Sequence, residues 1–449
     1  MRRITAVWGT GNYFNQIFNK LKHYVEIDYL IDSDTNKVGK RLTQKQIECI
    51  LPKQIAEKNI SLILIAVIDK AQCREIVKYL EFNKIKYDYA DYYMDSLEIQ
   101  RINSFNYTSN LRNNQSRLQR VIFVQIPNLW CNFRCSYCYL IQNNENVLIG
   151  ETMRYPHKPE YISKALNYKR LGGMAYIDLT SFGETLLYKD IVELTKLLLK
   201  EGHIVSITTN GTITDRLNEL LGIEDKLKER LFIRFSFHFK ELEKKNLTLK
   251  FFENVKAVQK SVASMTVMMV AEDTYLPYKD KIKKIFIKEL GALPQLDFVR
   301  ESTNDRFALL SKKTLEEYLE EWSDFKSKKF EHRRHFFERK ITEWCHAGDC
   351  CSFLNIFTGE LYACSQTPSF TNIYNDITQE IQFKEFGFGC PCDWCVNTIM
   401  WENFGAIETS YKGPGYAEIL NRIDKEGNSW IKKPLYQILN QKILEKSRG

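Results

Sequence analysis

The chain has 449 residues with 64 basic and 56 acidic side chains, which leaves a mild formal net charge of +8. This length exceeds one ordinary core, so two or three domains are expected, and so small a charge excess indicates no nucleic-acid partner. No stretch reaches the roughly 18 uninterrupted apolar residues of a membrane span, and no signal-peptide pattern precedes the first strand candidate. The composition therefore predicts a cytoplasmic protein without a membrane span.

Residues 1–94 alternate between strand-like and helix-like segments. The strand candidates are "ITAVWG", "VEIDYLIDSD", "SLILIAVI" and "IKYDYAD", and helical periodicity occurs in "NYFNQIFNKLK" and from about Ala71. Such alternation favours an α/β fold with an open parallel sheet. We therefore expect a Rossmann-like domain over residues 1–94.

The first strand of this domain enters an incomplete dinucleotide fingerprint. Gly9 and Gly11 fit the pattern and Asp32 ends the second strand, but Phe14 occupies the third glycine position. NAD is therefore disfavoured. Through "LIDSDTNKVGK" the segment resembles Rossmann-like domains at the front of some sugar-modifying enzymes. A ligand-binding domain and a vestigial docking domain both remain open.

A polar, Asn-rich segment over residues 95–118 is predicted to be a linker. After it, a strand and a helix recur about every thirty residues. Six strands are expected to begin near Val121, Met174, His203, Leu231, Ser264 and Leu293. Because eight strands are not available, the pattern predicts a partial, open (β/α)6 barrel over residues 119–325, with its chemistry at the C-terminal strand ends.

The loop "CNFRCSYCYL" after the first barrel strand carries three of the chain's 12 cysteines, Cys131, Cys135 and Cys138. Clustered thiols in a reducing compartment point to metal or redox chemistry. Three thiolates can bind three irons of a cubane cluster and leave the fourth iron without a protein ligand. Zinc would require a fourth nearby ligand, and the closest histidine is His157. Cys49 and Cys73 stand alone and are expected to be inert thiols.

This CxxxCxxC loop, with Tyr137 before its last cysteine, resembles the signature of the radical S-adenosylmethionine (SAM) superfamily. The resemblance implies a 4Fe-4S cluster whose open iron is chelated by SAM. An electron from the cluster, supplied by an external donor such as flavodoxin or ferredoxin, then cleaves SAM to a 5′-deoxyadenosyl radical that abstracts a substrate hydrogen.

Other strand ends carry residues to which the same resemblance assigns roles. "TSFGETLLY" is similar to the family's GGE motif, although Phe182 replaces its first glycine. The residues expected to contact SAM are Tyr137, Gly183, Glu184, Thr209, Asn210, Ser236 and Arg300. Ser236 and His238, in "RFSFHF", are the candidate catalytic residues. The alternatives are ordinary strand-end polar residues and, for Arg300, a solvated side chain or an anchor for an anionic substrate.

A second cysteine group lies in residues 326–395, where "CHAGDCCSFLNIFTGELYAC" resembles the first half of a SPASM or twitch extension. Thr358-Gly359 is expected to turn a hairpin that brings two thiols together. The full seven-cysteine SPASM pattern is absent, so one auxiliary 4Fe-4S cluster is expected. Its predicted ligands are Cys345, Cys364 and Cys395, with Cys390 or Cys392 as the fourth. Structural zinc is the alternative. Residues 396–449 are expected to be helical.

The predicted function is radical SAM chemistry on a saccharide or nucleotide-linked small molecule, with oxidation, epimerisation or dehydration as outcome. A peptide-modifying enzyme is the alternative, but residues 1–94 do not resemble the winged-helix domain that often precedes such enzymes. Epimerisation would need a hydrogen donor, for which Cys350 and Cys351 are candidates. A non-enzymatic electron carrier is disfavoured, because it would have no use for an open iron.

Overall fold

A computed structural model describes residues 3–43, 45–103, 117–145, 154–303, 306–340, 342–387, 390, 392–395 and 397–443. The chain forms two compact units. The first comprises Met1–Thr108 and Gly150–Lys164, and the second comprises Ser109–Ile149 and Ala165–Gly449. The segment 150–164 therefore belongs to the N-terminal unit, although it follows the first strand of the second unit in sequence.

The first unit contains a six-stranded sheet in the order β3-β4-β2-β1-β5-β6. Neighbouring strands are parallel except β3 and β4. The strands are β1 (Thr5–Trp8), β2 (Tyr29–Ile31), β3 (Arg41–Leu42), β4 (Ile47–Ile50), β5 (Leu62–Ile65) and β6 (Tyr87–Tyr89). The sequence predicted β1, β2, β5 and β6. It missed β3 and β4 because strands of two and four residues carry too little periodicity to be recognised.

Helices cover this sheet because successive strand residues point to opposite faces. Val7, Leu30 and Leu64 pack in one buried cluster, while Ala6 and Ile63 pack in another. The helices of the unit are α1 (Asn12–Leu21), η1 (Pro52–Gln54), α2 (Lys70–Phe82), α3 (Ala90–Asn103) and α5 (Pro159–Ala165), the last of which ends at the unit boundary. Burial on both faces explains the continuous apolar strands from which an α/β fold was predicted.

Helix α3 extends into the predicted linker, so residues 95–103 are helical, whereas residues 104–116 lie outside the described part of the chain. Polar side chains of α3 make buried contacts. Arg154 donates two hydrogen bonds to Asp91, at 2.7 and 2.8 Å. Asp95 pairs with His157 Nδ1 at 2.9 Å. Sequence periodicity could not anticipate these partners, because they come from a distant segment.

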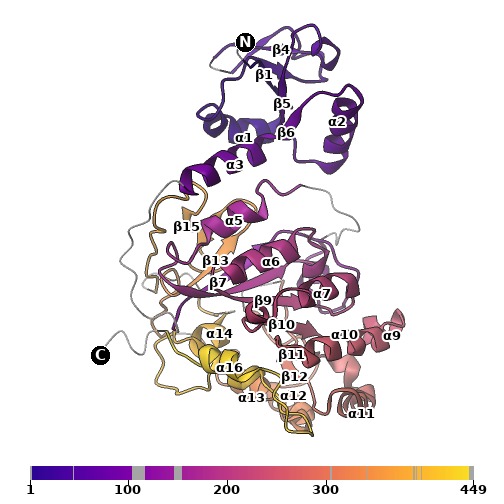
Figure 1. Ribbon diagram of the computed structural model, residues 1–449. Helices are drawn as coiled ribbons and strands as arrows, with labels where there is room; N and C mark the ends of the chain where they lie inside the picture. Colours follow the sequence, from indigo (N-terminus) through magenta and orange to yellow (C-terminus); the bar gives the residue numbers. More distant parts are fainter. Residues whose placement is uncertain are drawn as a thin grey trace. The chain divides into compact units, whose positions relative to one another are not determined.

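The second unit contains a nine-stranded sheet in the order β12-β11-β10-β9-β8-β7-β13-β14-β15. All neighbouring strands from β7 to β12 are parallel. Figure 1 shows β7, β9, β10, β11 and β12 following one another through this unit, with α6, α7, α10 and α11 beside them. The bounds are β7 (Leu118–Ile126), β8 (Met174–Ser181), β9 (Ile204–Thr209), β10 (Leu231–Ser236), β11 (Ser264–Ala271) and β12 (Gln295–Phe298). The six predicted strands are therefore present.

Helices connect these parallel strands, as crossovers between parallel neighbours require. The connecting helices are α4 (Tyr139–Gln142), η2 (Thr185–Leu187), α6 (Ile191–Lys200), α7 (Thr214–Leu221), α8 (Asp225–Lys228), α9 (Phe239–Lys244), α10 (Thr248–Lys260), η3 (Asp273–Tyr278) and α11 (Lys279–Leu290). Helix α6 illustrates why they form, because Ile191, Leu194 and Leu198 recur on one helical face and are all buried. Among the described helices, none is long and apolar enough to cross a membrane.

The cysteine-rich segment continues the same sheet. Strand β13 (Cys351–Asn355) pairs in parallel with β7, from Cys351 opposite Val121 to Asn355 opposite Gln125. Strands β14 (Glu360–Tyr362) and β15 (Ser369–Asn372) extend it in antiparallel fashion. The remaining helices are α12 (Leu315–Trp322), η4 (Ser323–Phe325), α13 (Lys328–Arg334), α14 (Thr398–Asn403), α15 (Tyr416–Leu420) and α16 (Lys433–Leu439). The predicted domain boundaries within this unit stay predictions.

Candidate functional site

The three-cysteine loop directly follows β7, at the edge of the sheet where the parallel strands end. Cys131, Cys135 and Cys138 all line a cavity of about 430 Å³. The Cys138 N–H donates to the Cys135 carbonyl at 3.0 Å, and Cys138 precedes helix α4. The three thiols are partly buried. The structure thus gathers the first predicted ligand set around one cavity.

The surroundings of these thiols suit a cationic cluster. Burial raises the pKa of Cys131 to about 11, although the Phe133 N–H donates to its sulfur at 3.4 Å. The pKa of Cys135 is raised by burial and then by the neighbouring Cys131 and Cys138. Thiolates so placed repel one another, so the ionised set needs a positive partner such as iron. The donor set therefore fits a 4Fe-4S cluster. Among the described residues of the loop, none supplies a fourth protein ligand.

The turn at Gly183 and Glu184 is bonded to the chain just before Cys131. The Gly183 N–H donates to the Asn128 carbonyl at 2.7 Å, and the Glu184 N–H donates to the Trp130 carbonyl at 2.5 Å. A Cβ on Gly183 would lie 1.9 Å from the Trp130 oxygen, so only glycine fits. The turn that follows β8 therefore positions the first cysteine.

The predicted residues Glu184, Thr209 and Asn210 come together, but they bond to one another. The buried Glu184 carboxylate accepts from the Thr209 hydroxyl at 2.6 Å, the Asn210 N–H at 2.7 Å and the Leu186 N–H at 3.0 Å. Burial raises the pKa of Glu184, against the effect of these hydrogen bonds. Gly183 lines the cavity, whereas these three residues are not among the described residues that line it. Their contacts with SAM stay predictions.

Tyr137 and His238 form a partly buried pair on the cavity wall. The Tyr137 hydroxyl lies 2.7 Å from His238 Nδ1 and 3.3 Å from the hydroxyl of Tyr275. Burial lowers the pKa of His238 to about 4, so the ring is neutral at pH 7. Ser236, the other candidate catalytic residue, ends β10 and is not among the described residues that line the cavity. Sequence reasoning missed Tyr275, which follows a strand end without a motif.

Arg300 lies where the cavity meets a second, smaller hollow. It lines both spaces, and burial, followed by the like charge of Arg333, lowers its pKa to about 10. The smaller hollow is also lined by Arg306, Arg339 and Cys395. No sequence motif marks these arginines, because they come from separate segments of the chain.

The second cysteine group converges near this hollow. Burial raises the pKa of Cys345 to about 12, with further contributions from Cys395 and Cys364. Burial also raises the pKa of Cys392 to about 12, with contributions from Cys390, Cys364 and Cys395. Cys364 and Cys395 therefore lie within electrostatic range of both Cys345 and Cys392. Within the described residues, however, no three side chains gather as tightly as a single metal ion would require.

The hairpin between β13 and β14 turns where the sequence predicts. The Gly359 N–H donates to the Asn355 carbonyl at 2.8 Å, and Gly359 has φ of +78°. A Cβ there would lie 2.3 Å from the Tyr374 ring. The Cys364 sulfur, just beyond β14, accepts from the Gln366 N–H at 3.4 Å, a contact that suits a ligating thiolate. Cys350 and Cys351 are buried, with their sulfurs 3.9 Å apart.

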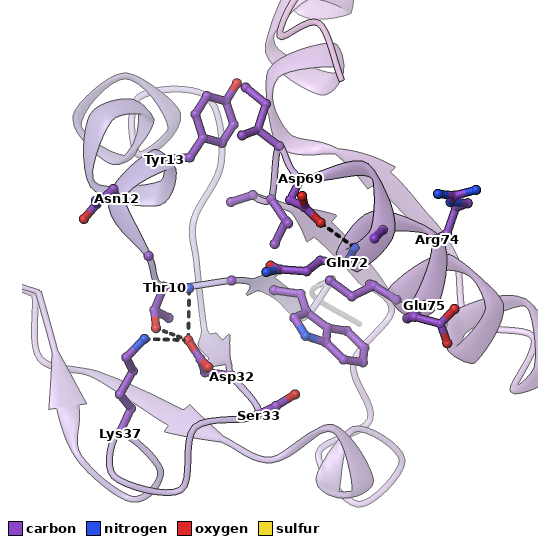
Figure 2. A pocket seen from close by; sticks show the side chains of 18 of the residues that line it. Thr10, Asn12, Tyr13, Asp32, Ser33, Lys37, Asp69, Gln72, Arg74 and Glu75 are labelled. Atoms are coloured by element: carbon purple, nitrogen blue, oxygen red, sulfur yellow. Dashed lines mark hydrogen bonds and ion pairs between the residues drawn. The ribbon is translucent and has the colours of Figure 1, made fainter. Parts of the chain in front are cut away.

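The first unit has a cavity of its own, of about 860 Å³, at the C-terminal ends of β1, β2 and β5 (Figure 2). On one side, Asp32 accepts hydrogen bonds from Thr10 N–H at 3.2 Å and from Lys37 Nζ at 3.0 Å. On the other side, Asp69 caps helix α2, and the exposed Arg74 lies farther along that helix.

The incomplete fingerprint of the first unit has a structural explanation. Phe14 is 2% exposed and packs against Phe18 in the core beneath α1. A glycine in that position permits close approach of helix and strand, whereas a phenyl ring fills the space. Asp32 Oδ2 accepts from Thr10 and Lys37, and its Oδ1 accepts from the Asp34 N–H at 3.0 Å. That NAD is disfavoured stays a prediction.

Comparison with known proteins finds a family model that matches part of the chain. Residues 126–265 match the Radical SAM superfamily. The curated proteins contain no match. Among solved structures, native anSMEcpe with bound AdoMet is 16% identical, with coverage of 57% of this chain and 78% of that chain and a TM-score of 0.39. Streptococcus suis SuiB bound to S-adenosylmethionine is 13% identical, with coverage of 70% and 73% and a TM-score of 0.39. BtrN in complex with AdoMet and 2-DOIA is 12% identical, with coverage of 59% and 82% and a TM-score of 0.29.

Proposed function

We propose, from the premise that residues 126–265 form a domain of the Radical SAM superfamily, that this protein is a radical SAM enzyme with one auxiliary iron-sulfur cluster. The observation that carries the proposal is the grouping of Cys131, Cys135 and Cys138 on one cavity at the C-terminal strand ends. When bound, the cluster and SAM supply a 5′-deoxyadenosyl radical that takes a hydrogen atom from the substrate.

The chain's own residues shape the place where this chemistry occurs. Gly183 holds the turn against Trp130 and so fixes Cys131. The Tyr137 hydroxyl and the neutral His238 ring can share a proton at the cavity wall, because they lie 2.7 Å apart. Phe133, with 3% exposure, packs edge-on against His238 and helps to exclude water from the thiols. Ser236, Thr209, Asn210, Glu184 and Arg300 complete the proposed SAM-binding surroundings.

The auxiliary cluster is proposed to take Cys345, Cys364 and Cys395, with Cys390 or Cys392 as its fourth ligand. Its support is the mutual influence of these thiols on their pKa values. A fully ligated cluster leaves no iron for the substrate, so electron transfer to or from a substrate radical is its proposed role. An external donor such as flavodoxin or ferredoxin would reduce the first cluster, in a cytoplasmic setting.

The proposed substrate is a saccharide or nucleotide-linked small molecule. In support, the first unit has an open, mostly parallel six-stranded sheet with a large cavity of its own, which differs from the small winged-helix domain expected in front of a peptide-modifying enzyme. A ribosomal peptide is the second candidate, through the twitch resemblance of the second cysteine group.

Deuterium transfer tests this function. Anaerobically reconstituted protein is incubated with SAM, a reductant and deuterated nucleotide-sugars or peptides, and 5′-deoxyadenosine is analysed by mass spectrometry. We expect deuterium to enter 5′-deoxyadenosine from the nucleotide-sugar class. Cys135→Ala serves as the control and should form none of this product. Reconstituted wild-type protein that forms no 5′-deoxyadenosine would contradict the proposal.

A further inference from the structure

The cavity of the first unit, called here the first-unit cavity, lies where the order of the parallel strands reverses. The neighbours of β1 in the sheet are β2 on one side and β5 on the other. Residues that follow all three strands line the cavity, among them Gly11 after β1, Asp32 after β2 and Ala66 after β5. In open parallel sheets, ligands bind at such a switch point, outside the carboxyl ends of the strands.

The cavity opens because helices α1 and α2 cover opposite faces of the sheet. Phe14 of α1 belongs to one buried cluster of the unit, and Leu80 of α2 belongs to the other. The chain therefore leaves β1 and β5 toward opposite faces, and a space of about 860 Å³ lies beside the starts of both helices. Pockets for small molecules have roughly this size, about 300–1,000 Å³.

The two helix starts at this cavity differ in their caps. Asp69 caps α2, because its carboxylate accepts from the Gln72 N–H at 2.8 Å. Helix α1 begins after Gly11, which has no side chain to accept from the first turn. The Asn15 N–H donates to the Gly11 carbonyl at 3.2 Å, so the N–H groups before Asn15 have no intrahelical partner. Such N–H groups, together with the helix dipole, favour a phosphate.

Two glycines keep the start of α1 accessible. Gly9 has φ of +102°, and a Cβ there would lie 2.6 Å from Val67 Cγ2, so the loop after β1 can rest against the loop after β5 only without a side chain. A Cβ on Gly11 would meet nothing within 4 Å. Between them, the Thr10 N–H donates to Asp32 at 3.2 Å. The loop is therefore held in place before a ligand arrives.

Trp8 adds an aromatic surface and a hydrogen-bond donor at the end of β1. It lines the cavity, is 6% exposed and packs edge-on against Tyr79, with 5.4 Å between the ring centres. Among the residues that the structure describes, none accepts a hydrogen bond from Trp8 Nε1, and this nitrogen is not sealed from solvent as those of Trp322 and Trp430 are. A buried indole N–H usually has an acceptor, which a ligand in the cavity would supply.

The charged side chains that line the cavity balance one another, so net charge does not select the ligand. Its described lining includes three acidic and three basic residues, namely Asp32, Asp69, Glu75, Lys37, Arg74 and Lys78. Lys37 pairs with Asp32 at 3.0 Å, and Lys78 pairs with Glu75 at 2.9 Å. Selection therefore depends on the open N–H groups of α1 and on the indole, which suit a phosphate joined to a ring system.

From these features we propose that the first-unit cavity binds a nucleoside diphosphate, with its phosphates at the start of α1 and its nucleoside beside Trp8. The nucleotide can be free or can carry a sugar, because both forms present the same groups to the cavity. The inference goes beyond the proposed function, since it assigns a ligand to the first unit whether or not that ligand is also the substrate.

Calorimetry tests this inference. ADP, UDP, ADP-glucose, UDP-glucose and pyrophosphate are titrated separately into reconstituted holoenzyme with saturating SAM, so that the proposed SAM site is already filled. We expect ADP or UDP to bind and pyrophosphate to bind more weakly. Gly11→Asp should weaken nucleotide binding about tenfold, because its carboxylate accepts from the same N–H groups and repels phosphate. The matched control, Gln16→Glu, adds the same charge at an exposed position of α1 and should leave binding unchanged.

The outcomes separate the two sources of the nucleotide from the failure of the idea. A glucose-bearing nucleotide that binds at least as tightly as its diphosphate indicates a sugar-carrying ligand, and weaker binding indicates a free nucleotide. Undiminished binding in Gly11→Asp, an equal loss in Gln16→Glu, pyrophosphate as tight as the nucleotides, or binding of neither ADP nor UDP overturns the inference. An Asp at this position caps α1 and so does not threaten folding. Absence of nucleotide binding leaves the radical chemistry standing, whereas absence of 5′-deoxyadenosine formation removes the proposed function independently.

Discussion

At Gly183, the absence of a side chain allows a strand-end turn to touch the loop that precedes the first cysteine. An added Cβ would meet three backbone atoms of Trp130, the nearest at 1.9 Å. Neither segment can yield easily, because Gly183 and Glu184 both donate backbone hydrogen bonds across the contact. The sequence predicts that this glycine contacts SAM. The structure adds a second reason for glycine at this position, which is the close contact with Trp130, and this reason applies before any cofactor binds.

Gly183→Ala should therefore impair the first cluster itself. The methyl group must push Trp130 and with it Cys131, so we expect about four irons fewer per chain after reconstitution. Iron analysis and electron paramagnetic resonance measure the change. Gly11→Ala is the matched control, because a Cβ there meets nothing within 4 Å. Full iron content in Gly183→Ala would show that the turn does not position the cysteine.

At the scale of elements, His203 links β9 to the segment before β8. Its Nδ1 accepts from the Ala175 N–H at 3.1 Å, and its Nε2 donates to the Leu166 carbonyl at 2.8 Å. One ring nitrogen must accept, so the ring is neutral, and burial lowers its pKa from 6.5 to about 4. The sequence predicted only that a strand begins near His203. In the structure its side chain joins that strand to β8 and to the segment before β8.

His203 makes stability depend on pH. Between pH 6.5 and 4 His203 binds a proton in the unfolded chain, whereas the buried ring of the folded chain stays neutral. The contribution of His203 to the free energy of unfolding is therefore complete above pH 6.5 and falls as the pH drops toward 4. His203→Leu should unfold more easily at pH 7, by about 2 kcal/mol, because two buried backbone groups lose a partner. It should also lose less stability on acidification. Urea denaturation at pH 7 and 5 measures both effects.

The control for this pH dependence is His23→Gln, because His23 is exposed. His238, whose pKa is also lowered to about 4 by burial, retains its share of the acid sensitivity in the His203 variant. We therefore expect the free energy of unfolding to depend less steeply on pH in the variant, but still to depend on it. An unchanged slope in His203→Leu would contradict the neutral, buried ring.

At the scale of the whole molecule, ten of the 12 cysteines lie in the second unit. Cys49 and Cys73 are buried in the first unit, where Cys49 has its pKa raised to about 11 by burial. The β13–β7 pairing joins the hairpin that precedes Cys364 to the strand that precedes the first cysteine group. The arrangement predicts two separate clusters in one unit.

Reconstituted protein should hold about eight irons, from two cubanes. Cys395→Ala should retain about four and still cleave SAM without coupling to substrate, whereas Cys135→Ala should form no 5′-deoxyadenosine. Cys49→Ala, the control, should retain full iron content. Comparison of Cys390→Ala with Cys392→Ala then identifies the fourth auxiliary ligand as the variant that loses iron. Stoichiometric zinc at the second group would contradict the auxiliary cluster.

The sequence by itself determined the local features of this protein. Apolar periodicity located the six strands from β7 to β12, and the spacing of Cys131, Cys135 and Cys138 indicated the predicted cluster-binding loop. Both patterns could be recognised because they depend on residues close together in the chain. The turn at Gly359 was predicted for the same reason. The Gly183–Glu184 motif was found by resemblance, but not its bonds to Trp130 and Thr209.

Only the tertiary structure decided which distant segments meet. It paired β13 with β7, extended α3 into the predicted linker as far as Asn103, and gathered Arg300, Arg306, Arg333 and Arg339 around one hollow. No local pattern encodes such contacts, because their energy comes from burial and charge shared between segments that are far apart along the chain.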